Sequence, residues 1–371
     1  MTRKVKELPG GSLLVGTLPM GCKFCARGSK MVLFVTGLCD SSCYYCPISD
    51  DRKNTDTIFA DEMPVLNDEN ILFEVNAIQG EGAGISGGDP LCTLKRTLHY
   101  ISLLKGTYGP DFHIHLYTSK TTVTGDELTQ LIDAGLDEIR FHPQDEDWSG
   151  IEEAVSLGLL VGIEVPAIPG KEERLKQTAQ RAEKLGISFL NINELEASET
   201  NFEQLKTLGM RLTDLGSASI EGSEDTARQV LEWVSVHLKK LTVHFCSARY
   251  KDGIQLRNRL ERRLEQTIRE FEERDESEPL LILGIIRAPS GHNLTQHQLR
   301  RILHILQEKL EIEETDLNLD SNRLRIELAP WILDEQGDTI KSSLREFGAL
   351  EIGISYEYPS WDRLQTLFEP I

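Results

Sequence analysis

Apolar stretches of strand length alternate with amphipathic stretches over most of residues 31–250. The apolar stretches predict strands over 31–36, 84–86, 112–117, 138–141, 160–165, 189–192 and 241–245. Between them, apolar residues recur at helical spacing and predict helices over 94–104, 126–134, 151–157, 172–185 and 226–238. Strands that alternate with helices of this length pair in parallel, through βαβ units. The pattern therefore predicts an α/β fold in which about six such units form an open or closed barrel.

Many of the predicted strands carry polar side chains at every second position. In 112–117, for example, Ile114 and Leu116 alternate with His115 and Tyr117. Neighbouring side chains of a strand point to opposite faces, and a parallel strand covered by helices on both faces would be apolar throughout. We therefore expect one face to pack on helices and the other to line a lumen for a polar ligand; the alternative is an internal hydrogen-bond network without a ligand. The candidate lumen residues are His115, Arg140, His142, Glu164, Asn191 and Asn193.

The C-terminal third has a different organisation. Residues 249–274 predict a long helix that is the most basic stretch of the chain. Its cations either pair with Glu261, Glu265 and Glu270 on a solvated face or form a docking strip for RNA or an acidic partner. After an acidic linker we predict strands over 280–286, 324–328 and 350–356 and helices over 296–310 and 340–347. We therefore divide the chain into an N-terminal segment (1–30), a core barrel (31–248), a basic helix with linker (249–278) and a small α/β domain (279–371).

Composition narrows the class of protein. The chain has 371 residues and a formal net charge of −20, which disfavours nucleic-acid binding by phosphate neutralisation. No apolar run approaches membrane-spanning length, and the first residues lack the apolar segment of a secretory signal, so we expect a cytoplasmic protein with no membrane partner. The chain carries 7 cysteines. In a cytoplasmic protein these argue for metal ligation rather than for disulfides.

Three of the cysteines follow the first predicted strand of the barrel in a C-x3-C-x2-C array: Cys39, Cys43 and Cys46. Thiolates this close in sequence can converge on one metal centre, and soft sulfur ligands select iron–sulfur clusters or zinc. A structural zinc site usually closes with a fourth Cys or His nearby, and none follows here at the usual spacing. The array therefore favours a three-thiolate site with one open position, against the alternatives of a zinc loop or separate buried thiols.

This array, with the aromatic Tyr45 just before its last cysteine, resembles the signature loop of the radical S-adenosylmethionine (SAM) enzymes. The resemblance implies a partial (β/α)6 barrel over about residues 31–246. It implies a [4Fe-4S] cluster on Cys39, Cys43 and Cys46, with SAM chelated by the fourth iron. A ferredoxin-like or flavodoxin-like electron donor is expected to reduce the cluster.

Further matches extend the resemblance. Gly87, Gly88, Asp89 and Pro90 follow the second strand, where the family usually carries Gly-Gly-Glu to hold the SAM amino group; Asp89 is one methylene shorter than that glutamate. At other strand ends, the family's polar contacts to the adenosyl moiety correspond to Thr118 and Ser119. Its adenine-contacting pattern corresponds to Ile168 and Glu173, with Pro166 in place of the first glycine.

A second metal site is predicted from four residues outside this array. Cys22-x2-Cys25, followed by a glycine, has the form of a metal knuckle on a tight turn. His244 and Cys246 stand two apart on a predicted strand and so point to the same face. Together the four would complete a tetrahedral set for zinc or for a second iron–sulfur cluster. The alternative is a surface C-x2-C with an unrelated core His and Cys.

With Gly-Ala-Gly-Ile-Ser-Gly-Gly-Asp-Pro-Leu at 82–91 and His-Phe-Cys-Ser-Ala-Arg-Tyr-Lys-Asp at 244–252, the chain resembles in particular a largely archaeal branch of this family that is related to the pyruvate formate-lyase activating enzymes. It implies an enzyme that cleaves SAM reductively, and a 5′-deoxyadenosyl radical that abstracts hydrogen from an unidentified substrate. One alternative is an activase that installs a glycyl radical on a partner protein. The other is a non-catalytic iron–sulfur protein that transfers electrons.

Overall fold

A computed structural model of the chain describes residues 3–214 and 216–371. The chain forms two compact units, Met1–Arg259 and Leu260–Ile371. The boundary lies inside α10 (Arg257–Thr267), within the stretch predicted to be a basic helix and linker. In the described part of the chain, no helix combines the length and the apolar character that crossing a membrane requires.

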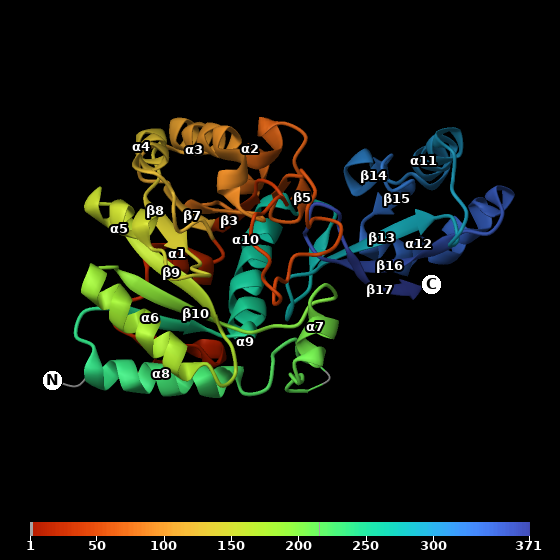
Figure 1. Cartoon of the computed structure of the whole chain (residues 1–371). Coiled ribbons are helices and arrows are strands. Elements are labelled where there is room, and N and C mark those ends of the chain that lie inside the picture. Colours follow the sequence, from red (N-terminus) through yellow and green to blue (C-terminus); the bar gives the residue numbers. More distant parts are fainter. Residues whose placement is uncertain (1–2, 215) are drawn as a thin grey trace. The chain divides into compact units, whose positions relative to one another are not determined.

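The first unit is built on an 11-stranded sheet of order β1-β2-β11-β10-β9-β8-β7-β6-β3-β4-β5 (Figure 1). Its central strands run parallel, and each was predicted: β3 (Lys30–Phe34), β6 (Gly82–Ser86), β7 (His113–Thr118), β8 (Glu138–Phe141), β9 (Leu160–Ala167), β10 (Phe189–Glu194) and β11 (Thr242–Cys246). The sheet ends in antiparallel edge strands, so it is an open, partial barrel. These edge strands are β1 (Lys6–Glu7) and β2 (Leu13–Val15) on one side and β4 (Phe59–Ala60) and β5 (Met63–Pro64) on the other.

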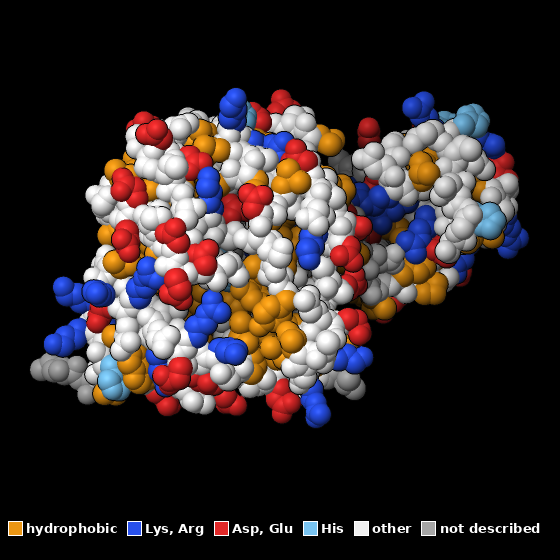
Figure 2. Space-filling view, in the orientation of Figure 1, with side chains coloured by type: hydrophobic (Ala, Val, Ile, Leu, Met, Phe, Trp, Pro, Cys, Tyr) orange, Lys and Arg blue, Asp and Glu red, His pale blue; other side chains and the backbone are white. Residues whose placement is uncertain are grey.

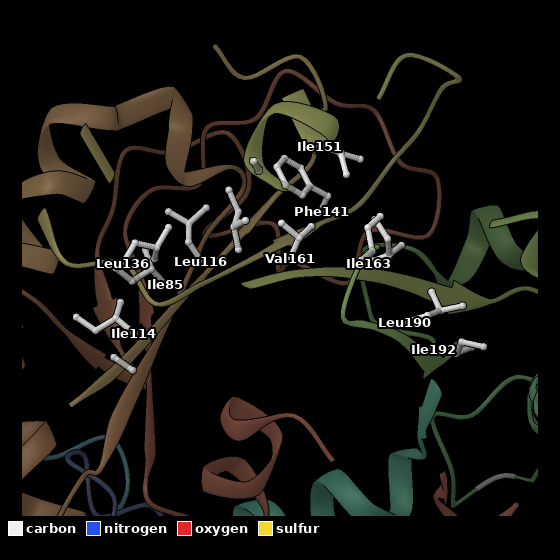
Figure 3. Close-up of a cluster of buried hydrophobic side chains, with 14 of the residues drawn as sticks. Ile85, Ile114, Leu116, Leu136, Phe141, Ile151, Val161, Ile163, Leu190 and Ile192 are labelled. Atoms are coloured by element: carbon white, nitrogen blue, oxygen red, sulfur yellow. The ribbon is translucent and has the colours of Figure 1, made fainter. Parts of the chain in front are cut away.

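The outer face of this sheet is covered by the helices that connect its strands (Figure 1). These are α2 (Asp68–Ala77), α3 (Leu94–Tyr108), α4 (Gly125–Ala134), α5 (Ser149–Ser156), α6 (Glu172–Leu185) and α8 (Ser223–His237), with the short α7 (Phe202–Thr207) before α8. The apolar residues of the alternating strands, such as Ile114, Leu116 and Ile163, are fully buried on the helix side (Figure 3). The alternation in the sequence therefore does separate a helix-covered face from an inner face.

The inner face is contacted by α1 (Met20–Ala26), which carries Cys22 and Cys25. The prediction of a tight turn here was wrong, because both cysteines lie on a helix. A Cβ atom on Gly21 would lie 2.7 Å from Nδ1 of His115 and 2.8 Å from Nη2 of Arg140, so the helix packs directly on polar lumen residues. Glycine permits this close approach, and only the folded chain shows that the approach occurs.

The predicted helix over 249–274 was also wrong in its extent. The stretch contains α9 (Ala248–Tyr250), a π-helical segment (Lys251–Leu256), α10 and then β12 (Glu273–Arg274). Several of its cations bond to carboxylates from distant segments, as Arg259 does to Asp61 at 2.5 Å and Lys251 to Glu196. This pairing supports the interpretation of the basic residues as paired charges, mostly with partners other than the three predicted glutamates. Of these three, Glu261 forms an ion pair within the stretch, with Arg274.

The second unit contains a 6-stranded antiparallel sheet of order β14-β15-β13-β16-β17, with β12 paired to β13. Its strands β13 (Leu281–Arg287), β15 (Arg325–Leu328) and β16 (Glu351–Glu357) and its helix α11 (Gln296–Leu310) were predicted. The pattern did not predict β14 (Leu317–Asp320) or β17 (Gln365–Pro370), and it placed the second helix too late. That helix, α12, spans Pro330–Ser343 and begins at a proline, which suits the first helical position.

Candidate active site at the ends of the parallel strands

Cys39, Cys43 and Cys46 lie on the loop that follows β3, and all three line one cavity of about 450 Å³. The carboxyl ends of parallel strands are where ligands bind in open α/β sheets. Burial raises the pKa of the Cys43 thiol, and the charges of Cys46 and Cys39 raise it further, which means that the three sulfur atoms are electrostatic neighbours. Among residues 3–214 and 216–371, no three His, Cys, Asp or Glu side chains are placed to hold a single metal ion. A four-iron cluster is wider than one ion, and three soft thiols around one cavity suit it.

The Gly-Gly turn after β6 lies against the beginning of the cysteine loop. The backbone N–H of Gly88 donates to the carbonyl of Thr36 at 2.7 Å, and that of Asp89 donates to the carbonyl of Leu38 at 2.7 Å. A Cβ on Gly88 would lie 2.3 Å from the Leu38 oxygen. Both Gly87 and Gly88 line the same cavity as the cysteines. A side chain at Gly88 would therefore separate two segments that together form one wall.

The side chain of Asp89 is directed elsewhere. Its buried carboxylate accepts hydrogen bonds from the backbone N–H of Leu91 (3.0 Å) and of Ser119 (2.8 Å) and from the hydroxyls of Thr118 (3.0 Å) and Ser119 (2.8 Å). Thr118, Ser119 and Pro90 line the cavity, whereas Asp89 is not among its lining residues. Asp89 therefore positions Thr118 and Ser119, and its contact with the SAM amino group remains a prediction.

Tyr45 and His142 join the cysteine loop to the barrel. Nδ1 of His142 donates to the backbone carbonyl of Glu164 at 2.6 Å, which leaves Nε2 as the acceptor for the Tyr45 hydroxyl at 2.8 Å. Burial lowers the pKa of His142, so its ring is neutral near pH 7, and burial raises the pKa of Tyr45 to about 12. The hydroxyl therefore remains a donor.

The barrel lumen contains a second cavity, of about 440 Å³. Five of the six predicted lumen residues line it: Arg140, His142, Glu164, Asn191 and Asn193. The sixth, His115, is fully buried beside α1 and is not among the lining residues. Ser86, Gly87, Tyr117 and His142 line both this cavity and the one beside the cysteine loop. The two cavities are therefore adjacent.

A hydrogen-bond network connects the lumen residues. Arg140 donates to Glu138 (2.5 Å) and to Glu164 (3.0 Å), and Glu164 also accepts from Asn191 (3.2 Å) and Asn193 (2.9 Å). The internal network is therefore present and borders a cavity, and the binding of a polar ligand in that cavity remains a prediction. Glu138 was missed as a member, although it alternates with Ile139 on β8.

Two further lumen residues were missed. Lys30, at the start of β3, is only 8% exposed, and its Nζ lies 3.5 Å from the Tyr117 hydroxyl. Burial lowers the pKa of Lys30, but the charges of Cys25, Tyr117 and Cys22 outweigh this and raise it above its usual value. Tyr117 could have been found, since it shares the alternation of His115. Lys30 resembles an ordinary charged residue before an apolar strand.

The four residues of the predicted second metal site, Cys22, Cys25, His244 and Cys246, all line the lumen cavity. Cys22 and Cys25 come from α1, and His244 and Cys246 come from β11. Burial raises the pKa of the Cys246 thiol to about 12, and Cys25 and Cys22 contribute to the rise. The structure therefore brings together residues that are more than two hundred positions apart in the sequence.

The predicted adenine-contacting pair is split. Ile168 lines a third cavity, of about 780 Å³, together with Cys43, Tyr44 and Tyr45. Hydrophobic side chains gather in a hollow beside α6 and α7 (Figure 2), which contribute Leu175 and Gln204 to this cavity. Glu173 has a side chain that is 79% exposed and pairs with Lys176 at 2.7 Å. It does not line the three cavities described here.

Comparisons with known proteins identify the family of this chain. The radical SAM superfamily matches residues 33–193. A Methanocaldococcus jannaschii protein named "Putative glycyl-radical enzyme activating enzyme MJ0021" is 36% identical over 364 residues, which are 94% of this chain and 91% of that protein.

Two solved structures are more distant. The coproporphyrinogen III oxidase HemN of Escherichia coli, a radical SAM enzyme, is 13% identical with a TM-score of 0.36. The alignment covers 59% of this chain and 56% of the HemN chain. The radical SAM methyltransferase TsrM of Kitasatospora setae is 12% identical with a TM-score of 0.35. The alignment covers 86% of this chain and 61% of the TsrM chain. On the match to the superfamily and the full-length relative, this chain is an enzyme of the radical SAM superfamily.

Proposed function

We propose that this enzyme cleaves SAM reductively and uses the resulting 5′-deoxyadenosyl radical to abstract hydrogen from a substrate in the lumen. One observation carries the proposal: the cavity beside Cys39, Cys43 and Cys46 shares five lining residues, Ile48, Ser86, Gly87, Tyr117 and His142, with the polar lumen cavity. A radical formed in the first cavity would therefore lie next to a substrate held in the second.

In this proposal the cysteines hold a [4Fe-4S] cluster, which supplies the electron and the chelating iron when bound. The protein contributes geometry. Gly87 and Gly88 offer backbone groups close to the cysteine loop, and Thr118 and Ser119 offer hydroxyls fixed by Asp89. Tyr45 and His142 hold the loop against the barrel. Placing reactants in contact and excluding water are the contributions expected of a protein in cofactor chemistry.

The lumen indicates a polar substrate. Its lining offers amide donors and acceptors at Asn193, carboxylate oxygens at Glu164 and cations at Lys30 and Arg140. Such a mixture recognises a molecule that carries both anionic and neutral polar groups. The chemical identity of the hydrogen donor follows from deuterium transfer into 5′-deoxyadenosine from labelled candidates.

A second candidate function is favoured by the 36% identical relative, whose name describes an activating enzyme for a glycyl-radical enzyme. In that case the hydrogen donor is a glycine Cα of a partner protein, and the product is a glycyl radical on that partner. Its mark is a stable complex with the partner and a glycyl signal in electron paramagnetic resonance. A small-molecule substrate gives neither.

The decisive experiment is anaerobic reconstitution with iron and sulfide, followed by addition of dithionite and SAM. We expect 5′-deoxyadenosine and methionine in equal amounts. Cys43→Ala should abolish both products. Cys92→Ala is the matched control, since Cys92 is exposed and outside the array, and it should retain them. Reconstituted wild-type protein that forms no deoxyadenosine would overturn the proposal and favour a non-catalytic iron–sulfur protein.

A further inference from the structure

The lumen contains a second group of thiols that the proposed function does not use. Cys22 and Cys25 are three apart on α1 and so lie on one face of that helix. His244 and Cys246 are two apart on β11 and so point to one face of that strand. All four line the 440 Å³ lumen cavity. A helix near the start of the first unit's sequence and a strand near its end thus direct thiol and imidazole groups into one cavity.

The sulfur atoms accept hydrogen bonds from nitrogen donors. Nδ2 of Asn191 donates to Sγ of Cys22 at 3.3 Å, and Nη2 of Arg140 donates to the same atom at 3.6 Å. Nε2 of Gln255 donates to Sγ of Cys246 at 3.6 Å. Donors of this kind, one of them a guanidinium, stabilise thiolates rather than neutral thiols. Hydrogen bonds to sulfur are also one of the ways in which proteins tune iron–sulfur centres.

His244 has a free nitrogen in the same place. The ring is 1% exposed, and its Nδ1 lies 3.0 Å from Oδ1 of Asn191. Because the Asn191 nitrogen is donating to Cys22 and Glu164, its oxygen accepts, so Nδ1 carries the hydrogen. Nε2 is then an unprotonated acceptor, and it is buried without a hydrogen-bond partner. A metal-binding histidine has this form, with one nitrogen fixed by a neighbour and the other presenting a lone pair.

A buried cation in the cavity lacks a carboxylate partner. Among the described residues, no carboxylate lies within ion-pair distance of the Lys30 ammonium, although the residue is only 8% exposed. An unpaired buried charge is costly, so a counter-charge is expected nearby. The groups that interact electrostatically with Lys30 are Cys25, Tyr117 and Cys22, and Glu164 from beyond ion-pair distance. Thiolates bound to a metal centre would place such negative charge beside Lys30.

We propose that Cys22, Cys25, Cys246 and His244 hold a second iron–sulfur cluster at the wall of the lumen. A single zinc ion would need the ligands about 2.0–2.3 Å from one point. Within the described residues no three such side chains stand that way, for this group or for the signature cysteines. A cluster spaces its ligands further apart than one ion does, and the four residues border one cavity of about 440 Å³ that could hold it. The inference goes beyond the proposed function and does not depend on the substrate.

The position of this cluster gives it a direct relation to the substrate. The same cavity is bordered by Gly87, Tyr117 and His142, which also border the SAM side. An occupant of the lumen would lie between the two metal centres. The cluster would also join α1 to β11, and so fix the helix that packs on the inner face of the barrel.

The first test uses a variant that cannot build the radical cluster, Cys39→Ser with Cys43→Ser and Cys46→Ser, reconstituted anaerobically as the full chain. We expect about four iron and four sulfide per chain to remain, with a Mössbauer spectrum of a cubane cluster. Because the radical site is absent, this result is independent of SAM cleavage and of the proposed function. Protein without iron and sulfide, or with one zinc ion and no sulfide, would overturn the inference.

The second test removes the inferred site from protein with an intact signature loop. Cys22→Ser with Cys246→Ser should lose about half of the iron bound by wild-type protein. Cys92→Ser is the matched control and should lose none, and circular dichroism checks that both variants are folded. Retention of all the iron by the folded double variant would contradict the inference.

The histidine ligand has its own readout. In the reduced protein lacking the signature cysteines, ¹⁴N coupling to the cluster should be seen by pulsed electron paramagnetic resonance. His244→Cys should keep the iron and remove that coupling, because a thiolate replaces the imidazole. The assignment of His244 would be wrong if the ¹⁴N coupling persisted in the His244→Cys variant. It would also be wrong if the His244→Cys variant lost its iron while the parent protein, which lacks only the signature cysteines, kept it.

Discussion

The hydroxyl of Tyr45 donates to Nε2 of His142 across 2.8 Å, and this bond joins the cysteine loop to the strand that forms the wall of the lumen. The orientation of His142 is fixed by its second bond, to the carbonyl of Glu164 on β9. Three separate segments thus determine where the signature loop lies. The array in the sequence supplies the proposed ligands, Cys39, Cys43 and Cys46, whereas this bond contributes to the placement of the loop that carries them.

Replacing Tyr45 by Phe should therefore affect SAM cleavage more than cluster binding. Loss of one hydrogen bond of about 1 kcal/mol should lower the initial rate of deoxyadenosine formation about fivefold. Iron content should remain that of wild type, because no sulfur is removed. Tyr44→Phe is the matched control, since its ring meets that of Tyr45 edge to face at a centroid distance of 4.8 Å and its hydroxyl is not part of this link. Equal rates for the two variants would contradict the role given to the bond.

Asp89 allows a second prediction, about SAM affinity. The Asp89 carboxylate accepts hydrogen bonds from two hydroxyls and from two backbone N–H groups. In Asp89→Ala these four donors would lose their buried acceptor. We expect a loss of about 2–4 kcal/mol in the free energy of unfolding, measured by urea denaturation.

The same variant should bind SAM at least about tenfold more weakly, because Thr118 and Ser119 are no longer fixed. Equilibrium dialysis with reconstituted protein measures this. Asp40→Asn is the control for charge, as Asp40 is an exposed residue of the cysteine loop. Unchanged stability in Asp89→Ala would show that the four contacts are not what holds the turn.

The sequence predicted those parts of the fold that are set by local periodicity. The alternation of Ile114 and Leu116 with His115 and Tyr117 defines two faces of β7, and the structure has both. It did not predict that Cys22 and Cys25 lie on a helix, because the seven-residue α1 is held by the contact of Gly21 with His115 and Arg140, which are distant in sequence.

In the candidate site, too, local sequence predicted some residues, and contacts between distant residues decided the others. The spacing of Cys39, Cys43 and Cys46 predicted them as site residues, and the resemblance to the family predicted Gly87 and Gly88. All five line the same cavity. Lys30 was missed because its burial depends on α1 and on Tyr117 rather than on its neighbours in the chain. The direction of the Asp89 side chain could not be predicted either, since Asp and Glu differ by one methylene and only the position of Thr118 decides which contact is made.

Gly88 provides a third prediction. In Gly88→Ala the new Cβ would lie 2.3 Å from the backbone oxygen of Leu38, so the cysteine loop or the turn must move. A displacement of about 1 Å next to reacting groups can lower a rate about 100-fold, and we expect a loss of that order in deoxyadenosine formation. Gly106→Ala in α3 is the matched control. A Cβ there meets no atom within 4 Å, and the helix should gain about 1 kcal/mol in stability. A Gly88→Ala enzyme with the wild-type rate would show that the close approach is not required.

A fourth prediction concerns the stability of the protein in acid. His115 is fully buried, and its pKa lies well below the usual value because of burial and of the positive charges of Arg140 and Lys30, with a smaller contribution from His113. The folded state therefore binds fewer protons than the unfolded state once the pH falls below about 6.5, the unfolded pKa. Stability is complete above that pH and is lost as the pH falls, by up to about 1.4 kcal/mol per pH unit for this one ring.

The measurement is the free energy of urea unfolding of metal-free protein between pH 7 and pH 5. His115→Leu removes the titrating ring while keeping an apolar side chain of similar size, so its stability should fall less steeply with acid than that of wild type. His99→Leu is the control, because His99 is exposed and pairs with Asp68. If the slope of His115→Leu equals that of wild type, then His115 either binds a proton in the folded state or does not titrate in this range, and its burial beside Arg140 and Lys30 would not be the source of acid sensitivity.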